Sequence, residues 1–145
     1  MRGFRFRMDP ILRLRAAQLE ARRAELQRES LRRDADQQAA DSADERARIS
    51  AAALEERLAA GTTAVMFRSE AGAQVMLRDA SRRAAARVLE SASNVSAARE
   101  RVVEAWRRSR ALETLRQRSL VRWQREGEKR EQRATDEVAA RRQAR

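Results

Sequence analysis

The clearest pattern in the chain is a regular run of uncharged positions in its second half. From Leu77 to Leu112, every residue at alternating steps of four and three is uncharged, in a sequence of which 38% is charged. At roughly 0.6 for each position, eleven such residues in succession arise by chance with a probability under about one in a hundred. The spacing predicts a long helix that packs this seam against a second helix. The seam consists of Leu77, Ser81, Ala84, Val88, Ser91, Val95, Ala98, Val102, Ala105, Ser109 and Leu112.

The first half has a less regular apolar stripe. Leucines recur every seven residues at Leu12, Leu19 and Leu26, and the apolar residues that follow no longer keep this spacing. Such a shift predicts a local change in supercoil, and the polar run 36–38 predicts a loosely held segment because little apolar area is buried there. The expected continuation is Leu31, Ala35, Ile49, Ala53, Leu54 and Leu58.

Helix boundaries are marked by capping residues. Asp9 before Pro10 is a strong helix start, because the carboxylate accepts from free N–H groups and proline suits the first turn. Gly61 can end that helix in the left-handed conformation, and a threonine at 62 or 63 can cap the next one. These signals predict one helical hairpin over residues 1–145, with helix one at about 9–59, a turn at about 60–63 and helix two at about 64–142.

The two predicted helices differ in length. If they pair backward from the turn, Asp9 comes level with about residue 115, and residues 116–145 have no partner within the chain. This overhang contains Leu120, Val121 and Trp123. Their apolar side chains predict burial against another protein, although Trp123 could equally serve for packing alone.

Composition narrows the fold and the chemistry. Four Gly, one Pro and a preponderance of helix-forming residues disfavour sheets, so the predicted class is all-α, an antiparallel coiled-coil hairpin. The absence of Cys and His removes thiol chemistry and most zinc and general-base options, and the carboxylates are spaced like solvated ion pairs. We therefore expect no enzyme activity, no metal and no cofactor. No run of a dozen apolar residues occurs, and the start lacks the apolar region of a secretory signal, so a cytoplasmic protein is expected.

Charge is distributed unevenly. The formal net charge is +11, and segments 1–33 and 99–145 carry +6 and +7, whereas 34–60 carries −4. A chain that folds back near its middle would bring the two basic segments together, which would orient a charged partner.

The two ends of the chain carry distinctive stretches. The N-terminal stretch FRFRMDPILRLRAAQLEARRAEL has an aromatic-basic opening and a leucine-rich helix start. The C-terminal stretch ALETLRQRSLVRWQREGEKREQRATDEVAARR has an L-x-x-L-x-x-R core and an aromatic at Trp123. Both ends resemble the FliJ family of the bacterial flagellar type III export apparatus. Together these stretches cover about half of the chain.

The resemblance implies a function and a set of partners. FliJ-like proteins act as the central stalk of the hexameric export ATPase, link it to the export gate protein FlhA and escort export chaperones. They attach to the inner membrane at the flagellar base only through the export apparatus. For the ATPase ring, the residues expected to make contact are Phe4, Phe6, Leu120, Val121 and Trp123.

The gate contact in the family uses apolar residues early in the second helix. In this chain the matching positions are Val75, Met76, Leu77 and Ala80. The chain departs from the family pattern just before them, where residues 71–73 are Ala, Gly and Ala instead of a bulkier apolar residue.

Several alternatives stay open at this point. Phe4 and Phe6 could belong to a frayed terminus, Trp106 could simply flank the seam, and Phe67 could plug the hairpin tip. A generic coiled-coil adaptor or a virulence type III secretion stalk would fit the same pattern. A nucleic-acid binder would explain the computed pI near 11.6, but 22 acidic residues interleave with the basic ones. A membrane-surface rod is disfavoured because no strong apolar face lies opposite the arginines.

Overall fold

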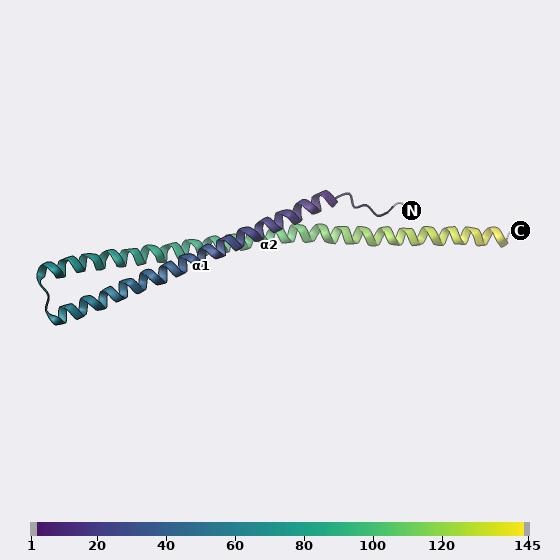
Figure 1. Cartoon of the computed structure of the whole chain (residues 1–145). Coiled ribbons are helices and arrows are strands. Elements are labelled where there is room, and N and C mark those ends of the chain that lie inside the picture. Colours follow the sequence, from purple (N-terminus) through teal and green to yellow (C-terminus); the bar gives the residue numbers. More distant parts are fainter. Residues whose placement is uncertain (1–2, 144–145) are drawn as a thin grey trace. The chain divides into compact units, whose positions relative to one another are not determined.

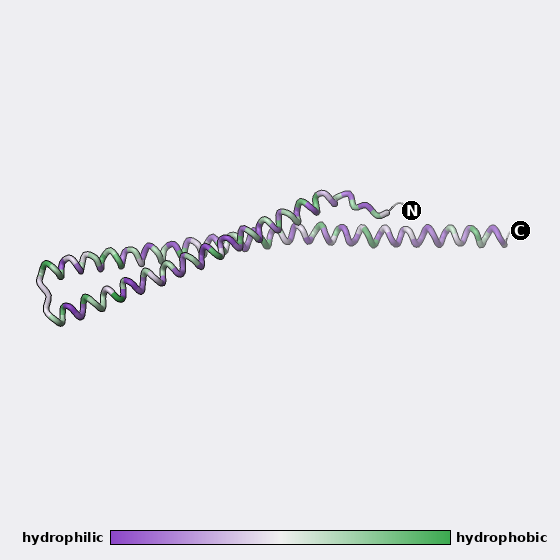
Figure 2. The backbone as a smooth tube through the Cα atoms, in the orientation of Figure 1, coloured by the Kyte–Doolittle hydropathy of each residue, from purple (hydrophilic) through white to green (hydrophobic). Residues whose placement is uncertain are grey.

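The protein consists of two long helices joined by a short turn. A computed structural model describes residues 3–143, in which α1 (Asp9–Ala60) and α2 (Ala64–Gln143) pack against each other, with no strand among these residues (Figure 1). The predicted all-α hairpin is confirmed. Hydrophobic and hydrophilic residues alternate along both helices, as expected of elements that bury only one stripe (Figure 2).

The start of α1 follows from its capping residues. Residues 3–8 are not helical, and the first contacts of the helix are Asp9 N to Phe6 O at 3.1 Å and Leu12 N to Met8 O at 2.9 Å. Pro10 lies in the first turn, where its missing N–H removes no hydrogen bond. The acidic side chain of Asp9 is also placed where the helix dipole favours negative charge.

The turn between the helices depends on one glycine and one threonine. Gly61 has a φ of +85°, and its N–H donates to Leu58 O at 3.3 Å. Thr63 then caps α2, because its Oγ1 accepts from Met66 N at 3.4 Å and its carbonyl accepts from Phe67 N at 3.0 Å. Gly72, by contrast, lies inside α2 and does not interrupt it.

We expect opposite effects from alanine at these two glycines. No atom lies within 4 Å of a Cβ added at either position, so backbone conformation alone decides the outcome. Gly61→Ala should destabilise the protein by about 1–2 kcal/mol because its φ is left-handed. Gly72→Ala should stabilise it by about 0.5–1 kcal/mol because alanine is the better helix residue. Thermal unfolding followed by circular dichroism measures both changes, and shifts of the same sign would contradict this assignment.

The predicted seam of α2 faces α1. Of its eleven residues, five are buried and six half-buried. Val95 and Ala98 have exposed fractions of 6% and 1%, whereas Leu89 on the outer face has 74%. The seam prediction is therefore confirmed. The buried members are Ala84, Ser91, Val95, Ala98 and Ser109.

The predicted shift of the α1 stripe is wrong at four of its six positions, which are exposed, whereas Ala53 and Leu54 are half-buried. Leu31, Ile49 and Leu58 are exposed by 62%, 59% and 48%. The inward positions instead keep alternating steps of three and four along the whole helix, with arginines at 22 and 33 that stay exposed. A regular partner surface fixes the inward face, and the two arginines lie at its edge with their guanidinium groups toward water. The remaining inward residues are Leu12, Arg15, Leu19, Leu26, Glu29, Asp36, Ala40, Ala43, Ala47, Ser50 and Leu54.

By its internal contacts the chain divides into two units, each containing part of both helices. The turn unit comprises residues 22–102, and the terminal unit comprises, among the described residues, 3–21 and 103–143. Polar contacts fix the antiparallel register of the turn unit. Between the helices they are Arg101 to Glu25 at 2.6 Å, Gln74 Nε2 to Ala47 O at 3.0 Å, Ser81 to Asp44 at 3.3 Å, and Arg57 with Glu70.

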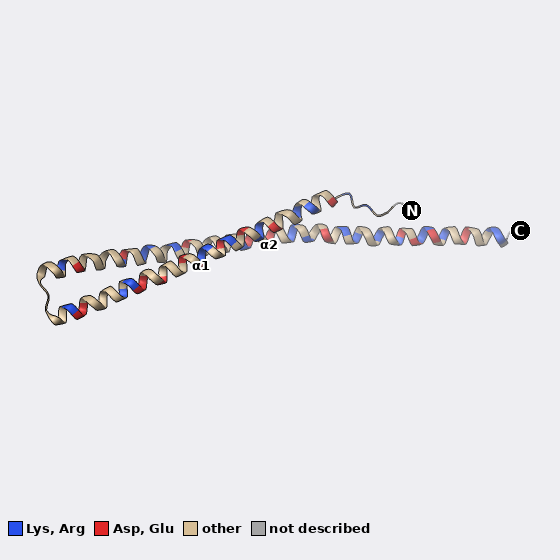
Figure 3. Cartoon of the chain, viewed as in Figure 1, with Lys and Arg blue, Asp and Glu red and all other residues tan. Residues whose placement is uncertain are grey.

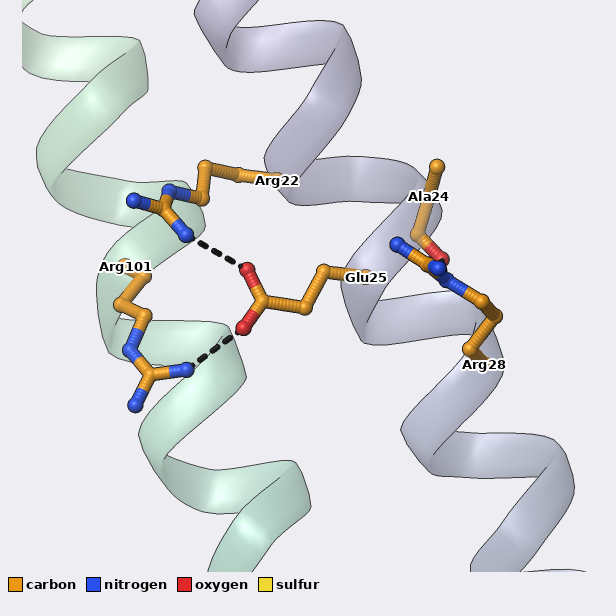
Figure 4. Close-up of polar contacts among 5 residues, drawn as sticks. All are labelled: Arg22, Ala24, Glu25, Arg28 and Arg101. Atoms are coloured by element: carbon orange, nitrogen blue, oxygen red, sulfur yellow. Dashed lines mark hydrogen bonds and ion pairs between the residues drawn. The ribbon is translucent and has the colours of Figure 1, made fainter.

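Glu25 forms ion pairs with arginines of both helices in the turn unit. Its two carboxylate oxygens accept from Arg22 on the same helix at 2.7 Å and from Arg101 on α2 at 2.6 Å (Figure 4). The hydrogen bond from Arg22, partly opposed by desolvation, and the Arg101 guanidinium lower the pKa of the Glu25 carboxyl from its ordinary value of 4.5. The ionised carboxylate therefore favours the folded state.

This pKa shift predicts a pH-dependent stability difference between the wild type and Glu25→Gln. A carboxyl whose pKa is lowered by folding contributes stability fully above its unfolded pKa and loses it as the pH falls through the folded pKa. The wild type should thus be the more stable at pH 7, and its advantage should vanish as the pH falls below about 4.5. Urea unfolding of both proteins at several pH values measures the difference. A difference that does not vary with pH would contradict the role of the ionised carboxylate.

Candidate functional site

The candidate sites are surfaces of the two helices and of the N-terminal residues. Within residues 3–143, no group of three or more His, Cys, Asp or Glu side chains is placed to hold a metal ion. None of the described helices has a stretch apolar enough to cross a membrane.

The N-terminal residues 3–8, here called the arm, lie against the C-terminal part of α2. The Phe4 and Trp123 rings have centroids 6.1 Å apart and planes inclined by 55°, a favourable tilted arrangement. Just behind the arm, Asp9 Oδ1 pairs with Arg116 Nε at 3.5 Å. The predicted overhang of α2 is therefore too long, because the arm extends the contact from residue 116 to Trp123, whereas residues 124–142 are exposed apart from Gly127.

The other predicted terminal residues lie in the same unit. Phe6, Leu120 and Val121 are half-buried, and Trp123 is 39% exposed. Of the five residues predicted to contact the ATPase ring, the structure joins Phe4 and Trp123 directly. Because Phe4 contacts Trp123, the alternative of a frayed N-terminus does not describe the chain from residue 4 onward.

The terminal unit carries most of the protein's net charge. Its sequence segments 1–21 and 103–145 contain 18 basic and nine acidic residues, which is +9 of the total +11. Basic and acidic residues interleave along both helices (Figure 3). Residues 116–125, however, include four arginines and no acid. This stretch is the most strongly basic part of α2 near the aromatic pair.

A basic stripe on α2 was not predicted from the sequence, because the carboxylates interleaved with the basic residues are spaced like solvated ion pairs. Residues spaced at four, seven, eleven and fifteen share one helix face, and the stripe extends over about 22 Å. Within the described chain, none of its members has an ion pair. A search for basic residues at steps of three or four residues would have predicted this stripe from the sequence. The stripe consists of Arg118, Arg122, Arg125, Lys129 and Arg133.

The residues predicted for the gate contact divide between two environments. Val75 and Met76 are exposed by 59% and 73%. Leu77 is half-buried in the seam between the helices, and Ala80 is half-buried beside it. Only Val75 and Met76 therefore offer an open apolar surface.

Near the turn, Phe67 is 40% exposed, so it does not fully plug the hairpin tip.

Comparison with known proteins gives a match to one family over nearly the whole chain. The family model described as flagellar FliJ protein matches residues 4–145. The chain belongs to the FliJ family. Membership covers the middle of the chain as well as the two ends that carried the resemblance, and it makes the protein a component of the flagellar export apparatus. No curated protein and no solved structure matches the chain significantly.

Proposed function

We propose that this FliJ-family protein is the non-enzymatic central stalk of the hexameric flagellar export ATPase, and that its terminal unit enters the ring. The single observation that supports this most strongly is the terminal unit itself, which combines +9 of the net charge with Trp123, 39% exposed, and with arginines that have no ion pair among the described residues. A rod with this end can bury apolar groups in a ring and set its arginines against acidic loops.

Electrostatics would act mainly on the rate of encounter. Arg118, Arg122 and Arg125 are exposed, so an acidic partner would be attracted over roughly a Debye length, about 8–10 Å at physiological salt. Exposed charges of this kind raise the association rate more than they raise the final affinity. Binding should therefore weaken as salt is added.

A pull-down tests the proposal directly. The tagged full-length chain, added to a lysate of the source bacterium, should retain the export ATPase, identified by mass spectrometry. The triple variant Arg118→Glu/Arg122→Glu/Arg125→Glu, treated in the same way, should retain much less of the export ATPase. Equal recovery by the two proteins, or recovery of no ATPase, would overturn the proposed contact.

The link to the export gate FlhA is proposed to use the open apolar surface at Val75 and Met76, and the same protein is proposed to escort export chaperones. The apparatus would then hold an otherwise cytoplasmic protein at the inner membrane.

Met76→Asp should weaken binding to the cytoplasmic domain of FlhA by about tenfold, because a carboxylate replaces a contact worth roughly 1.5–3 kcal/mol when buried. Leu89→Asp is the matched control, since Leu89 is exposed by 74% and Met76 by 73%. Isothermal titration of both variants measures the effect. Equal affinities would place the gate contact elsewhere.

A further inference from the structure

The arm is held to α2 by few interactions. The Phe4 ring lies tilted against the Trp123 ring, and Asp9, the first residue of α1, pairs with Arg116, both side chains of that pair being partly exposed. Among the residues that the structure describes, no hydrogen bond or ion pair joins the arm itself to α2. One aromatic pair changes an equilibrium by a factor of only about two to ten, and an exposed ion pair by less.

Charge opposes the position of the arm. The arm brings Arg5 and Arg7 to a stretch of α2, residues 116–125, that has four arginines and no acid. The acidic residues that flank the arm and this stretch along the chain are already paired: Asp9 with Arg116, Glu113 with Arg110 at 3.0 Å, and Glu126 with Arg130 at 3.5 Å. Like charges therefore gather around the aromatic contact, and releasing the arm relieves that repulsion.

We propose that the face of α2 around Trp123 is a docking surface for an acidic partner segment that presents an aromatic side chain, and that the arm covers it as a displaceable strap. The inference deepens the proposed function and rests on it only for the identity of the natural partner. In this account Phe4 competes with the partner instead of contacting it.

The chemistry of the surface defines the partner. A partner aromatic side chain replaces Phe4 against the Trp123 ring, so that Trp123 keeps an aromatic contact when the arm leaves. Carboxylates beside it meet Arg116 on the same face, once the arm and Asp9 move away, and Arg122 about a quarter of a turn round the helix. A basic or purely aliphatic segment would gain neither interaction. Acidic and aromatic character together are therefore required.

A polymer probe tests the surface without the ATPase. Fluorescein-labelled glutamate–tyrosine copolymer and polyglutamate are titrated with the full-length protein, and binding is followed by fluorescence anisotropy. We expect the copolymer to bind more tightly than polyglutamate. Phe4→Ala should strengthen copolymer binding by about two- to tenfold, the factor set by one aromatic pair. Phe67→Ala, a matched loss of a phenylalanine in the turn unit, should leave it unchanged.

Two further measurements isolate the role of Trp123. Trp123→Ala should reduce copolymer affinity to that of polyglutamate. In a Trp106→Phe background, in which Trp123 is the only tryptophan, Phe4→Ala should increase acrylamide quenching of fluorescence, whereas Leu14→Ala should not. Weaker or unchanged copolymer binding by Phe4→Ala would overturn the strap, and equal binding of the two polymers would overturn the aromatic site. Neither result depends on whether the export ATPase is the natural partner.

Discussion

Val95→Asp is expected to unfold much of the turn unit. Val95 is 6% exposed in the middle of the α2 seam, so the substitution removes a buried apolar side chain and places a carboxylate between the helices. An unpaired buried charge destabilises a protein by about 3–5 kcal/mol, a large part of the 5–15 kcal/mol that holds a typical domain folded. The loss should appear in thermal unfolding followed by far-ultraviolet circular dichroism.

Two exposed positions serve as controls for Val95→Asp. Leu89→Asp makes a comparable change on the outer face of the same helix, where the side chain is 74% exposed. Arg99→Asp changes charge at an exposed position one residue after the buried Ala98. Both should alter the free energy of unfolding by less than about 1 kcal/mol. Equal losses at the three sites would show that the seam has been placed on the wrong face.

Reversing the charge of the basic stripe should produce the largest effect on partner binding. Arg118→Glu/Arg122→Glu/Arg125→Glu converts three unpaired basic groups of α2 into acids, so an acidic partner is repelled instead of attracted. We expect at least about a tenfold loss of affinity for the export ATPase at low salt, mostly through a slower association rate. The gap between wild type and variant should narrow as salt screens the charges.

The matched control carries the same change of net charge on the turn unit. Arg78, Arg83 and Arg87 are exposed residues of α2 and have no ion pair among the described residues. Their triple replacement by glutamate should leave ATPase affinity within about twofold of wild type if position, and not total charge, governs binding. Surface plasmon resonance over a range of salt concentrations gives both association and dissociation rates. Similar losses of ATPase affinity in both triple variants would show that total net charge, and not the position of the arginines, governs binding.

The sequence was sufficient for α2 but not for α1. The α2 seam consists of uncharged residues from Leu77 to Leu112, so its period is visible directly. On α1 the same period passes through Arg15, Glu29 and Asp36. Their charges hide it, and the exposed Leu31 and Ile49 imitate a shifted stripe. The inward face of α1 became clear only from its packing against the regular partner.

The arm explains why the predicted overhang was too long. Counting helical residues alone ends the pairing near Asp9, which does contact Arg116. An extended residue, however, advances about 3.3 Å against 1.5 Å for a helical one, so a few non-helical residues reach far along α2. Phe4 thereby meets Trp123. Nothing in the sequence pattern fixed the path of residues 3–8, because a non-helical segment has no periodicity to reveal its partner.

ATP hydrolysis by the purified export ATPase, measured against added protein, tests the central claim that the terminal unit enters the ring. Full-length protein should stimulate hydrolysis in proportion to ring occupancy and less so at high salt. A chain lacking residues 116–145 should keep a helical turn unit by circular dichroism and give no stimulation. Met66→Asp/Phe67→Asp, altered at the exposed hairpin tip, should stimulate like the full-length protein. Undiminished stimulation by the truncated chain, together with loss of stimulation in the tip variant, would contradict the account and move the ring contact to the turn.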